Sequence, residues 1–92
     1  MHFVIHALDR PGAGDLRAST RECHLDYLAG FDVVLGGPLL DEEGEMCGSL
    51  IVIDVPDRTA GAELAAGDPY STAGLFSQVT IRGLRPVLGF TT

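Results

Sequence analysis

The order of strand and helix signals along this chain predicts an α+β fold of the ferredoxin-like βαββαβ class. Four short segments are rich in β-branched and aromatic residues, and two segments between them have helical spacing or a helix-forming composition. Two β-α-β halves of this kind build a sandwich of an antiparallel sheet with both helices on one face. Because 92 residues suffice for one hydrophobic core but not for two, we expect a single domain over residues 1–92.

The first half of the pattern begins with a strand over residues 2–8, which is rich in strand-forming side chains. A proline and two glycines in the segment 9–14 end that strand. A helix is expected from about residue 15 to 30, with Asp15 as its N-terminal cap and Gly30 near its end.

This helix is predicted from side chains that recur at helical spacing and would form one buried face. They are Leu16, Thr20, Cys23, Tyr27, Leu28 and Phe31. Arg17, Glu22 and Asp26 are polar, and the pattern as a whole is typical of an amphipathic helix.

Two further strands are expected to follow as a hairpin. Residues 33–35 begin the second strand, and Gly36-Gly37-Pro38 is expected to close it, because proline lacks the backbone donor that strand pairing needs. The acidic run 41–45 is expected to form a solvated turn, and residues 48–55 form the third strand.

The second half closes with a helix and a strand. Residues 57–66 are rich in alanine and predict the second helix, in which Gly61 costs about 1 kcal/mol relative to alanine. Asp68-Pro69-Tyr70 ends this helix, and residues 76–84 form the last strand.

The third strand is apolar on both of its faces. Ile51, Ile53 and Val55 point one way, whereas Leu50 and Val52 point the other, and the first strand repeats this alternation. Two helices cover only one face of the sheet, so the second apolar face needs another cover. We therefore expect a homodimer in which two sheets face each other.

Composition and charge exclude several classes of partner. The net charge is −7 and the six basic residues are all arginine, so the acidic surface repels phosphate backbones and we expect no nucleic-acid partner. No apolar run approaches the roughly 20 residues of a membrane helix. The N-terminus lacks the features of a signal peptide, and we expect a cytoplasmic protein that does not bind membranes.

The sequence indicates neither a metal site nor a cofactor. Cys23 and Cys47 fit no metal or redox spacing, and we expect two reduced thiols, with Cys23 near the buried face of its helix. His2 and His6 share a strand face but lie about 13 Å apart, too far to bind one metal together. The acidic run 41–45 lacks the ligand spacing of a calcium loop.

His24 is the most informative candidate for chemistry. Helical spacing places it beside Thr20 and Leu28 on the core-facing side of the helix, with Arg17 and Arg21 on its flank. A histidine that faces a pocket can act as a general acid or base near neutral pH. The alternative is a half-buried histidine with a structural hydrogen bond.

Asp68 is the second candidate. A carboxylate bonded to one ring nitrogen of a histidine fixes the tautomer and raises the basicity of the other nitrogen, so Asp68 could orient His24. The alternative is that Asp68 caps the short turn over residues 70–74.

Gly36-Gly37-Pro38 could form a pocket rim with exposed backbone amides, or only the exit of a strand. The chain contains neither phosphate-binding glycine motif, and Ser49 lacks the GxSxG context of a nucleophile.

Taken together, these segments resemble the YCII-related (YciI-like) family over almost the whole chain. The matching segments are Phe3-Val4-Ile5 running into Asp9, Arg21-Glu22-Cys23-His24-Leu25 with Tyr27-Leu28, Gly37-Pro38, Gly44 with Gly48-Ser49-Leu50, and Asp68-Pro69-Tyr70 with Ala73-Gly74-Leu75. Cys23 stands where alanine is common in the family, and the turn after Asp9 is richer in glycine.

The resemblance implies a ferredoxin-like fold that dimerises as an α/β barrel. It also implies that the family's proposed active-site histidine and aspartate fall on His24 and Asp68. A few relatives are enzymes that act without metal or organic cofactor on small cyclic or aromatic compounds, by dehydrohalogenation or isomerisation.

Three functional hypotheses follow. In the first, the protein is a cofactor-free enzyme in which His24 is the general acid or base, Asp68 orients it and Arg21 stabilises an anionic intermediate. Four further residues would contact the small-molecule substrate: Gly37, Pro38, Ser49 and Tyr70. In the second, a dimer binds a small ligand unchanged or serves as an accessory subunit. In the third, the dimer has only an assembly role, which predicts no cleft at His24.

Overall fold

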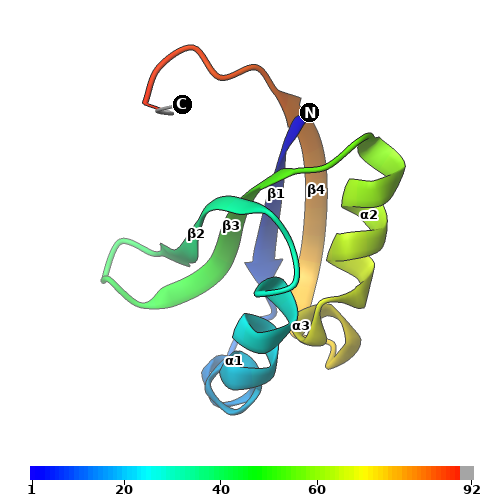
Figure 1. The fold of residues 1–92 in the computed structure, drawn as a ribbon. Coiled ribbons are helices and arrows are strands. Elements are labelled where there is room, and N and C mark those ends of the chain that lie inside the picture. Colours follow the sequence, from blue (N-terminus) through cyan, green and yellow to red (C-terminus); the bar gives the residue numbers. More distant parts are fainter. Residues whose placement is uncertain (90–92) are drawn as a thin grey trace.

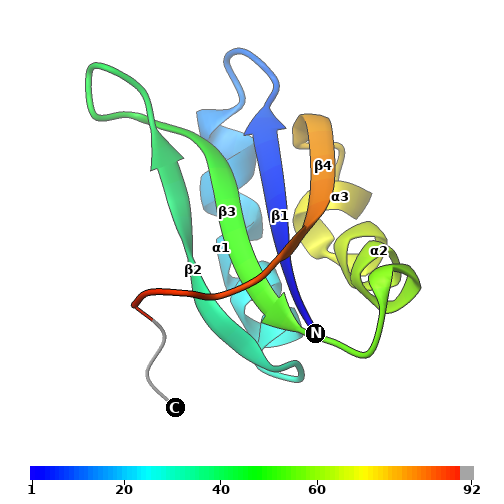
Figure 2. The ribbon, with the colours of Figure 1, turned by 90° about the horizontal axis from the view of Figure 1, so that it is seen from above.

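The computed structural model describes residues 1–89 and has the α+β architecture that the sequence predicts (Figure 1). Its elements are β1 (His2–Asp9), α1 (Gly14–Leu28), β2 (Val33–Leu40), β3 (Met46–Asp54), α2 (Arg58–Gly67), α3 (Pro69–Thr72) and β4 (Phe76–Leu84). The four strands form one antiparallel sheet in the order β2-β3-β1-β4. Figure 2 shows that the helices lie on one face of this sheet.

The hydrophobic core lies between the central strands and α2. Phe3 and Ile5 of β1 pack with Ile51 and Ile53 of β3, and Leu64 of α2 closes this cluster from the helix side. The Tyr27 hydroxyl donates a hydrogen bond of 2.9 Å to the Leu64 carbonyl oxygen, which ties α1 to α2. The core therefore holds α2 against the sheet, while α1 contributes Tyr27 and Leu28 to the rim of the core and is joined to α2 by a polar contact.

The second strand is longer than the sequence indicated. It does not end at Gly36-Gly37-Pro38 but runs through these residues to Leu40. The reason is its place in the sheet: β2 pairs only with β3, and an edge strand tolerates a proline whose missing N–H would face away from its neighbour. The Gly-Gly-Pro segment is thus part of the sheet, with Pro38 opposite Ser49.

Two expectations for the first helix are wrong. The cap residue is Ala13, which makes no side-chain hydrogen bond, and Asp15 lies inside the first turn, where a carboxylate still interacts favourably with the helix dipole. Cys23 is exposed rather than near the buried face. By contrast, Asp57 caps α2 as helix N-caps commonly do, because its carboxylate accepts a 2.9 Å hydrogen bond from the Ala60 amide.

The face of the sheet opposite the helices carries apolar side chains, as the alternation predicts. Val4 and Leu8 of β1 lie there with Leu50 and Val52 of β3, and all three helices of residues 1–89 lie on the other side. Leu35 of β2 is more than half exposed. No helix among the described residues is long and apolar enough to cross a membrane.

Gly48 is required because β3 passes close to the Ala7 carbonyl group of β1 at this position. A Cβ atom at this position would stand 2.3 Å from the Ala7 carbonyl oxygen, closer than any real side-chain contact. Gly48→Ala should therefore lower the free energy of unfolding by about 1–3 kcal/mol, because the backbone must move to relieve the overlap. Urea titration followed by circular dichroism measures this change.

Gly37→Ala on the neighbouring strand is the matched control, since a Cβ atom there meets nothing within 4 Å. We expect the Gly37 variant to stay within about 0.5 kcal/mol of the parent. Equal free energies of unfolding for the two variants would show that the close approach of β1 and β3 at Gly48 does not require glycine.

Candidate active site

A cavity of about 400 Å³ opens between α1 and the strands β2 and β3. Its wall is largely apolar, formed by residues such as Leu25, Leu28, Val33, Met46 and Ile51. Five polar or aromatic residues also border it: Arg17, Arg21, His24, Ser49 and Tyr70. Pockets that are mostly apolar, with a few convergent polar groups, are typical of sites for small molecules.

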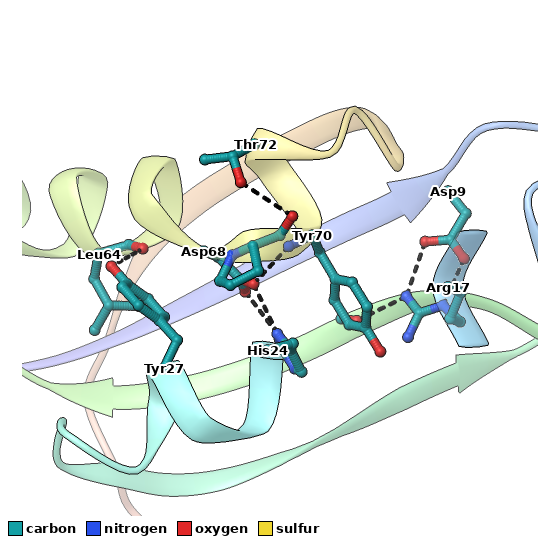
Figure 3. A network of polar contacts seen from close by, with 10 residues as sticks. Asp9, Arg17, His24, Tyr27, Leu64, Asp68, Tyr70 and Thr72 are labelled. Carbon is teal, nitrogen blue, oxygen red and sulfur yellow. Dashed lines mark hydrogen bonds and ion pairs between the residues drawn. The ribbon is translucent and has the colours of Figure 1, made fainter. Parts of the chain in front are cut away.

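The histidine and the aspartate singled out in the sequence meet beside this cavity (Figure 3). The Nδ1 atom of His24 lies 2.8 Å from one carboxylate oxygen of Asp68 and 2.9 Å from the other. Both side chains are buried, with 9% and 4% of their surfaces exposed. The helical face that carries His24 is therefore the face that packs toward α3.

Local sequence explains why Asp68 points at α1. The residue before a proline is held in an extended conformation, and Asp68 has φ −59° and ψ 129°, which ends α2 and lets Pro69 begin α3. As the N-cap of α3, the Asp68 carboxylate accepts a 2.9 Å hydrogen bond from the Tyr70 amide. The Asp68 carboxylate therefore caps α3 and contacts His24 at the same time, so the two interpretations drawn from the sequence do not exclude each other.

The hydrogen bonds around Asp68 indicate the tautomer of His24. Because the same Asp68 oxygen accepts from the Tyr70 amide and faces Nδ1, we assign the imidazole proton to Nδ1, which donates to the carboxylate. The other ring nitrogen, Nε2, then carries a lone pair, and His24 borders the cavity. This is the arrangement in which a histidine can remove a proton from a bound molecule.

Tyr70 lies between His24 and Arg17 (Figure 3). Its ring stacks on the His24 imidazole with centroids 4.0 Å apart, and the Arg17 guanidinium carbon lies 4.7 Å from its centroid. Burial raises the pKa of the Tyr70 hydroxyl, so this group stays neutral at physiological pH. The ring therefore helps to fix the orientation of both the His24 and the Arg17 side chains.

Arg17 is buried, which the sequence did not indicate. Its Nε and Nη2 atoms donate to the two carboxylate oxygens of Asp9 at 2.7 and 2.8 Å, and Nη2 also donates to the Ser49 hydroxyl at 2.8 Å. The hydrogen bond to Asp9 is the main cause of a raised pKa for Arg17, and burial opposes it. A buried arginine is stable only with such a partner, and here the partner Asp9 is the last residue of β1, eight residues before Arg17.

The spacing of residues on α1 could have revealed this arrangement. Arg17, Arg21 and His24 are separated by four and three residues, so they lie on one face of the helix. Arg21 is exposed and also borders the cavity. Helical spacing places Arg17 and Arg21 on the flank of His24 but does not indicate that Arg17 is buried.

The structure also places the remaining candidates. Gly37, Pro38, Ser49 and Tyr70 border the same cavity as His24, so all of the expected substrate-contacting residues are brought together. His6 lies on the other face of the sheet and does not join His24, because β1 buries the alternate residues toward the helices. Within residues 1–89, no three side chains of metal-binding type cluster together.

Comparison with known proteins identifies the family of this chain. The sequence pattern of the YCII-related domain matches residues 1–85, and the chain therefore belongs to the YCII-related family. A curated relative, an uncharacterised protein of Haemophilus influenzae, is 29% identical and is matched over 95% of this chain and 99% of its own length.

Two solved structures share the fold. The first is 5-chloro-2-hydroxyhydroquinone dehydrochlorinase (TftG) from Burkholderia phenoliruptrix in complex with 2,5-dihydroxybenzoquinone. It superposes with a TM-score of 0.85 and 27% identity over 92% of this chain and 94% of its own. Rv0793 from Mycobacterium tuberculosis superposes with a TM-score of 0.56 and 16% identity over 98% and 97% of the two chains, which shows a common fold.

Removing Arg17 alone should destabilise the protein far more than removing the pair. Arg17→Met leaves the buried Asp9 carboxylate without its partner, and we expect a loss of about 3–5 kcal/mol in the free energy of unfolding. The double variant Asp9→Asn with Arg17→Met leaves no unpaired charge and should recover most of that loss. Urea titrations of the parent, the single variant and the double variant provide the comparison, and losses of equal size in the two variants would contradict it.

Proposed function

We propose that the protein is a cofactor-independent enzyme that performs acid–base chemistry on a small cyclic or aromatic compound. The observation that supports this most is the buried hydrogen bond between His24 Nδ1 and Asp68 at the edge of a cavity of about 400 Å³. The dehydrochlorinase TftG, which has the same fold, provides a precedent for such chemistry within this architecture.

In the proposed reaction, His24 Nε2 accepts a proton from an acidic O–H or C–H bond of the substrate. The electron pair of that bond moves into the conjugated system and expels a leaving group such as chloride, or the proton returns at another atom to complete an isomerisation. The Asp68 carboxylate stabilises the imidazolium that forms and keeps the ring oriented. Positioned acid–base catalysis of this kind contributes roughly 10²–10⁴-fold in rate, which suits an activated substrate.

The other residues around the cavity would bind the substrate. Arg21 is placed to stabilise negative charge that develops in the intermediate, and Ser49 and Tyr70 border the same polar end. Gly37 and Pro38 shape the wall formed by β2. Apolar side chains around the rest of the cavity suit a ring that presents few polar groups there.

A second candidate function is a module that binds a small ligand without transforming it. The cavity supports this function equally well, and only the proton chemistry of His24 distinguishes the two. A ligand that raises the melting temperature and is recovered unchanged would favour the binding module. The third hypothesis, a purely structural dimer, required a filled interior at His24 and disagrees with the open cavity.

We also propose that the protein forms a homodimer through the open face of the sheet. This face is apolar and carries no helix of residues 1–89, and Leu35 there is 56% exposed, although Val52 is only 3% exposed. Light scattering coupled to size exclusion should give about twice the chain mass of 9.7 kDa at micromolar concentration. Leu50→Lys, which places a charge on this face, should shift the mass toward that of a monomer, and a parent protein that is already monomeric would contradict the proposal.

The catalytic role of His24 is tested by His24→Gln. Turnover is assayed on a panel of hydroxylated and halogenated ring compounds that includes 5-chloro-2-hydroxyhydroquinone, by chloride release and by exchange of substrate protons with deuterated solvent. The variant should lose about 10²–10⁴-fold in kcat, because glutamine cannot accept the proton. Its melting curve should still show a cooperative transition.

His6→Gln is the matched control for loss of a histidine, since His6 lies on the sheet face opposite the cavity, and its mass by light scattering should equal that of the parent because glutamine adds no charge to this face. This variant should keep the parental rate. Retention of full activity by His24→Gln on a compound that the parent converts would exclude His24 as the acid or base.

A further inference from the structure

We infer that Arg17 anchors an acidic oxygen of the ligand, so that the cavity selects ring compounds that carry a phenolate, enolate or carboxylate over their neutral counterparts. The inference rests on the proposed function and adds to it the class of ligand and a specificity-determining residue. Two observations support it: the hydrogen-bonding capacity that Arg17 retains, and the rigidity with which the fold holds this side chain.

The hydrogen bonds of Arg17 leave one end of its guanidinium group available. The bonds to Asp9 and Ser49 use Nε and Nη2, and the Tyr70 hydroxyl is a further side-chain partner of Arg17. Among residues 1–89, no fully buried side-chain nitrogen or oxygen lacks a hydrogen-bond partner. Nη1 carries two N–H groups, so one remains for a ligand even when the other contacts Tyr70, and Arg17 borders the cavity.

The side chain is also held in place before any ligand arrives. Arg17 is only 5% exposed, Asp9 holds its guanidinium through two bonds, and Tyr70 covers one of its faces. A planar guanidinium fixed in this way presents its remaining N–H groups in one direction, which favours recognition of an oxygen anion and avoids the entropic cost of ordering a free arginine.

Arg21 supplies a positive charge that no neighbouring carboxylate of the described residues compensates, whereas Asp9 compensates the charge of Arg17. The Arg17 cation is compensated by Asp9, whereas Arg21 has no carboxylate partner among residues 1–89 and lies one helical turn farther along α1 at the same cavity. Arg21 would thus attract the anion within a protein whose net charge is −7, and Arg17 would fix the position of its oxygen.

The positions of Arg17 and His24 separate the tasks of binding and proton transfer. They are seven residues apart on α1, about 10 Å along the helix axis, with the Tyr70 ring between them. An oxygen held at Arg17 Nη1 therefore differs from the atom that exchanges a proton with His24 Nε2. The favoured ligand carries its acidic oxygen on one side of the ring and its reactive position on another.

The test compares binding of benzoate and benzamide, which have nearly the same shape and differ in charge. Dissociation constants are measured by NMR titration of the parent, of the double variant Asp9→Asn with Arg17→Met, and of Arg17→Lys. The double variant keeps the net charge at −7, because it removes one acidic and one basic residue together. Arg17→Lys keeps the ion pair with Asp9 but lacks Nη1, and it serves as the second probe of the same role. Arg58→Met, on α2 and away from the cavity, controls for loss of an arginine.

We expect the parent to prefer benzoate by about tenfold, which corresponds to about 1.4 kcal/mol. The preference should fall to less than twofold in the double variant and should also fall in Arg17→Lys, while Arg58→Met keeps it. Equal binding of the two probes by the parent, or an unchanged preference in both Arg17 variants, would overturn the inference.

The outcome is separable from that of the proposed function. If His24→Gln retains the preference for benzoate and loses turnover, both proposals hold. If His24→Gln retains turnover and the Arg17 variants lose the preference, Arg17 is an anion anchor in a binding site and the proposed acid–base role fails alone. If turnover depends on His24 but the preference does not depend on Arg17, the present inference fails alone.

Discussion

The buried carboxylate of Asp68 joins parts of the chain that are far apart in sequence, and the geometry of the candidate site depends on it. Its oxygens lie 2.8 and 2.9 Å from Nδ1 of His24 on α1, and one of them caps α3 through the Tyr70 amide. A buried carboxylate needs several such partners to offset the loss of water. Because the Asp68-Pro69 sequence fixes the end of α2, the direction of this carboxylate is determined by the backbone.

A second buried ion pair places the other end of the site. Arg17 of α1 is bonded to Asp9 of β1 and to Ser49 of β3. Polar contacts thus hold this part of α1 to the sheet, whereas apolar packing holds α2. This division explains why the cavity opens beside α1. Tyr27 and Leu28 at the end of α1 still pack against the core, whereas the earlier turns are anchored through Arg17 and His24, and the cavity lies between this part of the helix and the strands.

Much of this organisation could be predicted from the sequence. The order of elements and the helical face of His24 followed from periodicity, and the pairing of His24 with Asp68 was suggested by the family resemblance. The full length of β2 could not be predicted, because only the position of the strand at the sheet edge makes Pro38 acceptable there. The position of Arg17 on the flank of His24 follows from helical spacing, but its burial could not be predicted. That burial depends on Asp9, and a pattern within one helix carries no information about a partner on a strand.

The measurement that tests the central claim most directly is the tautomer of His24 in solution. Two-dimensional ¹H–¹⁵N NMR of the histidine rings, with His24→Gln used to assign the signals, distinguishes a protonated Nδ1 from a protonated Nε2. A neutral His24 ring that carries its proton on Nδ1, facing Asp68, with an unprotonated Nε2 toward the cavity, is the result that the structure predicts. A proton on Nε2 with an unprotonated Nδ1 would mean that Asp68 is the donor, and the proposed base would not exist in the resting protein.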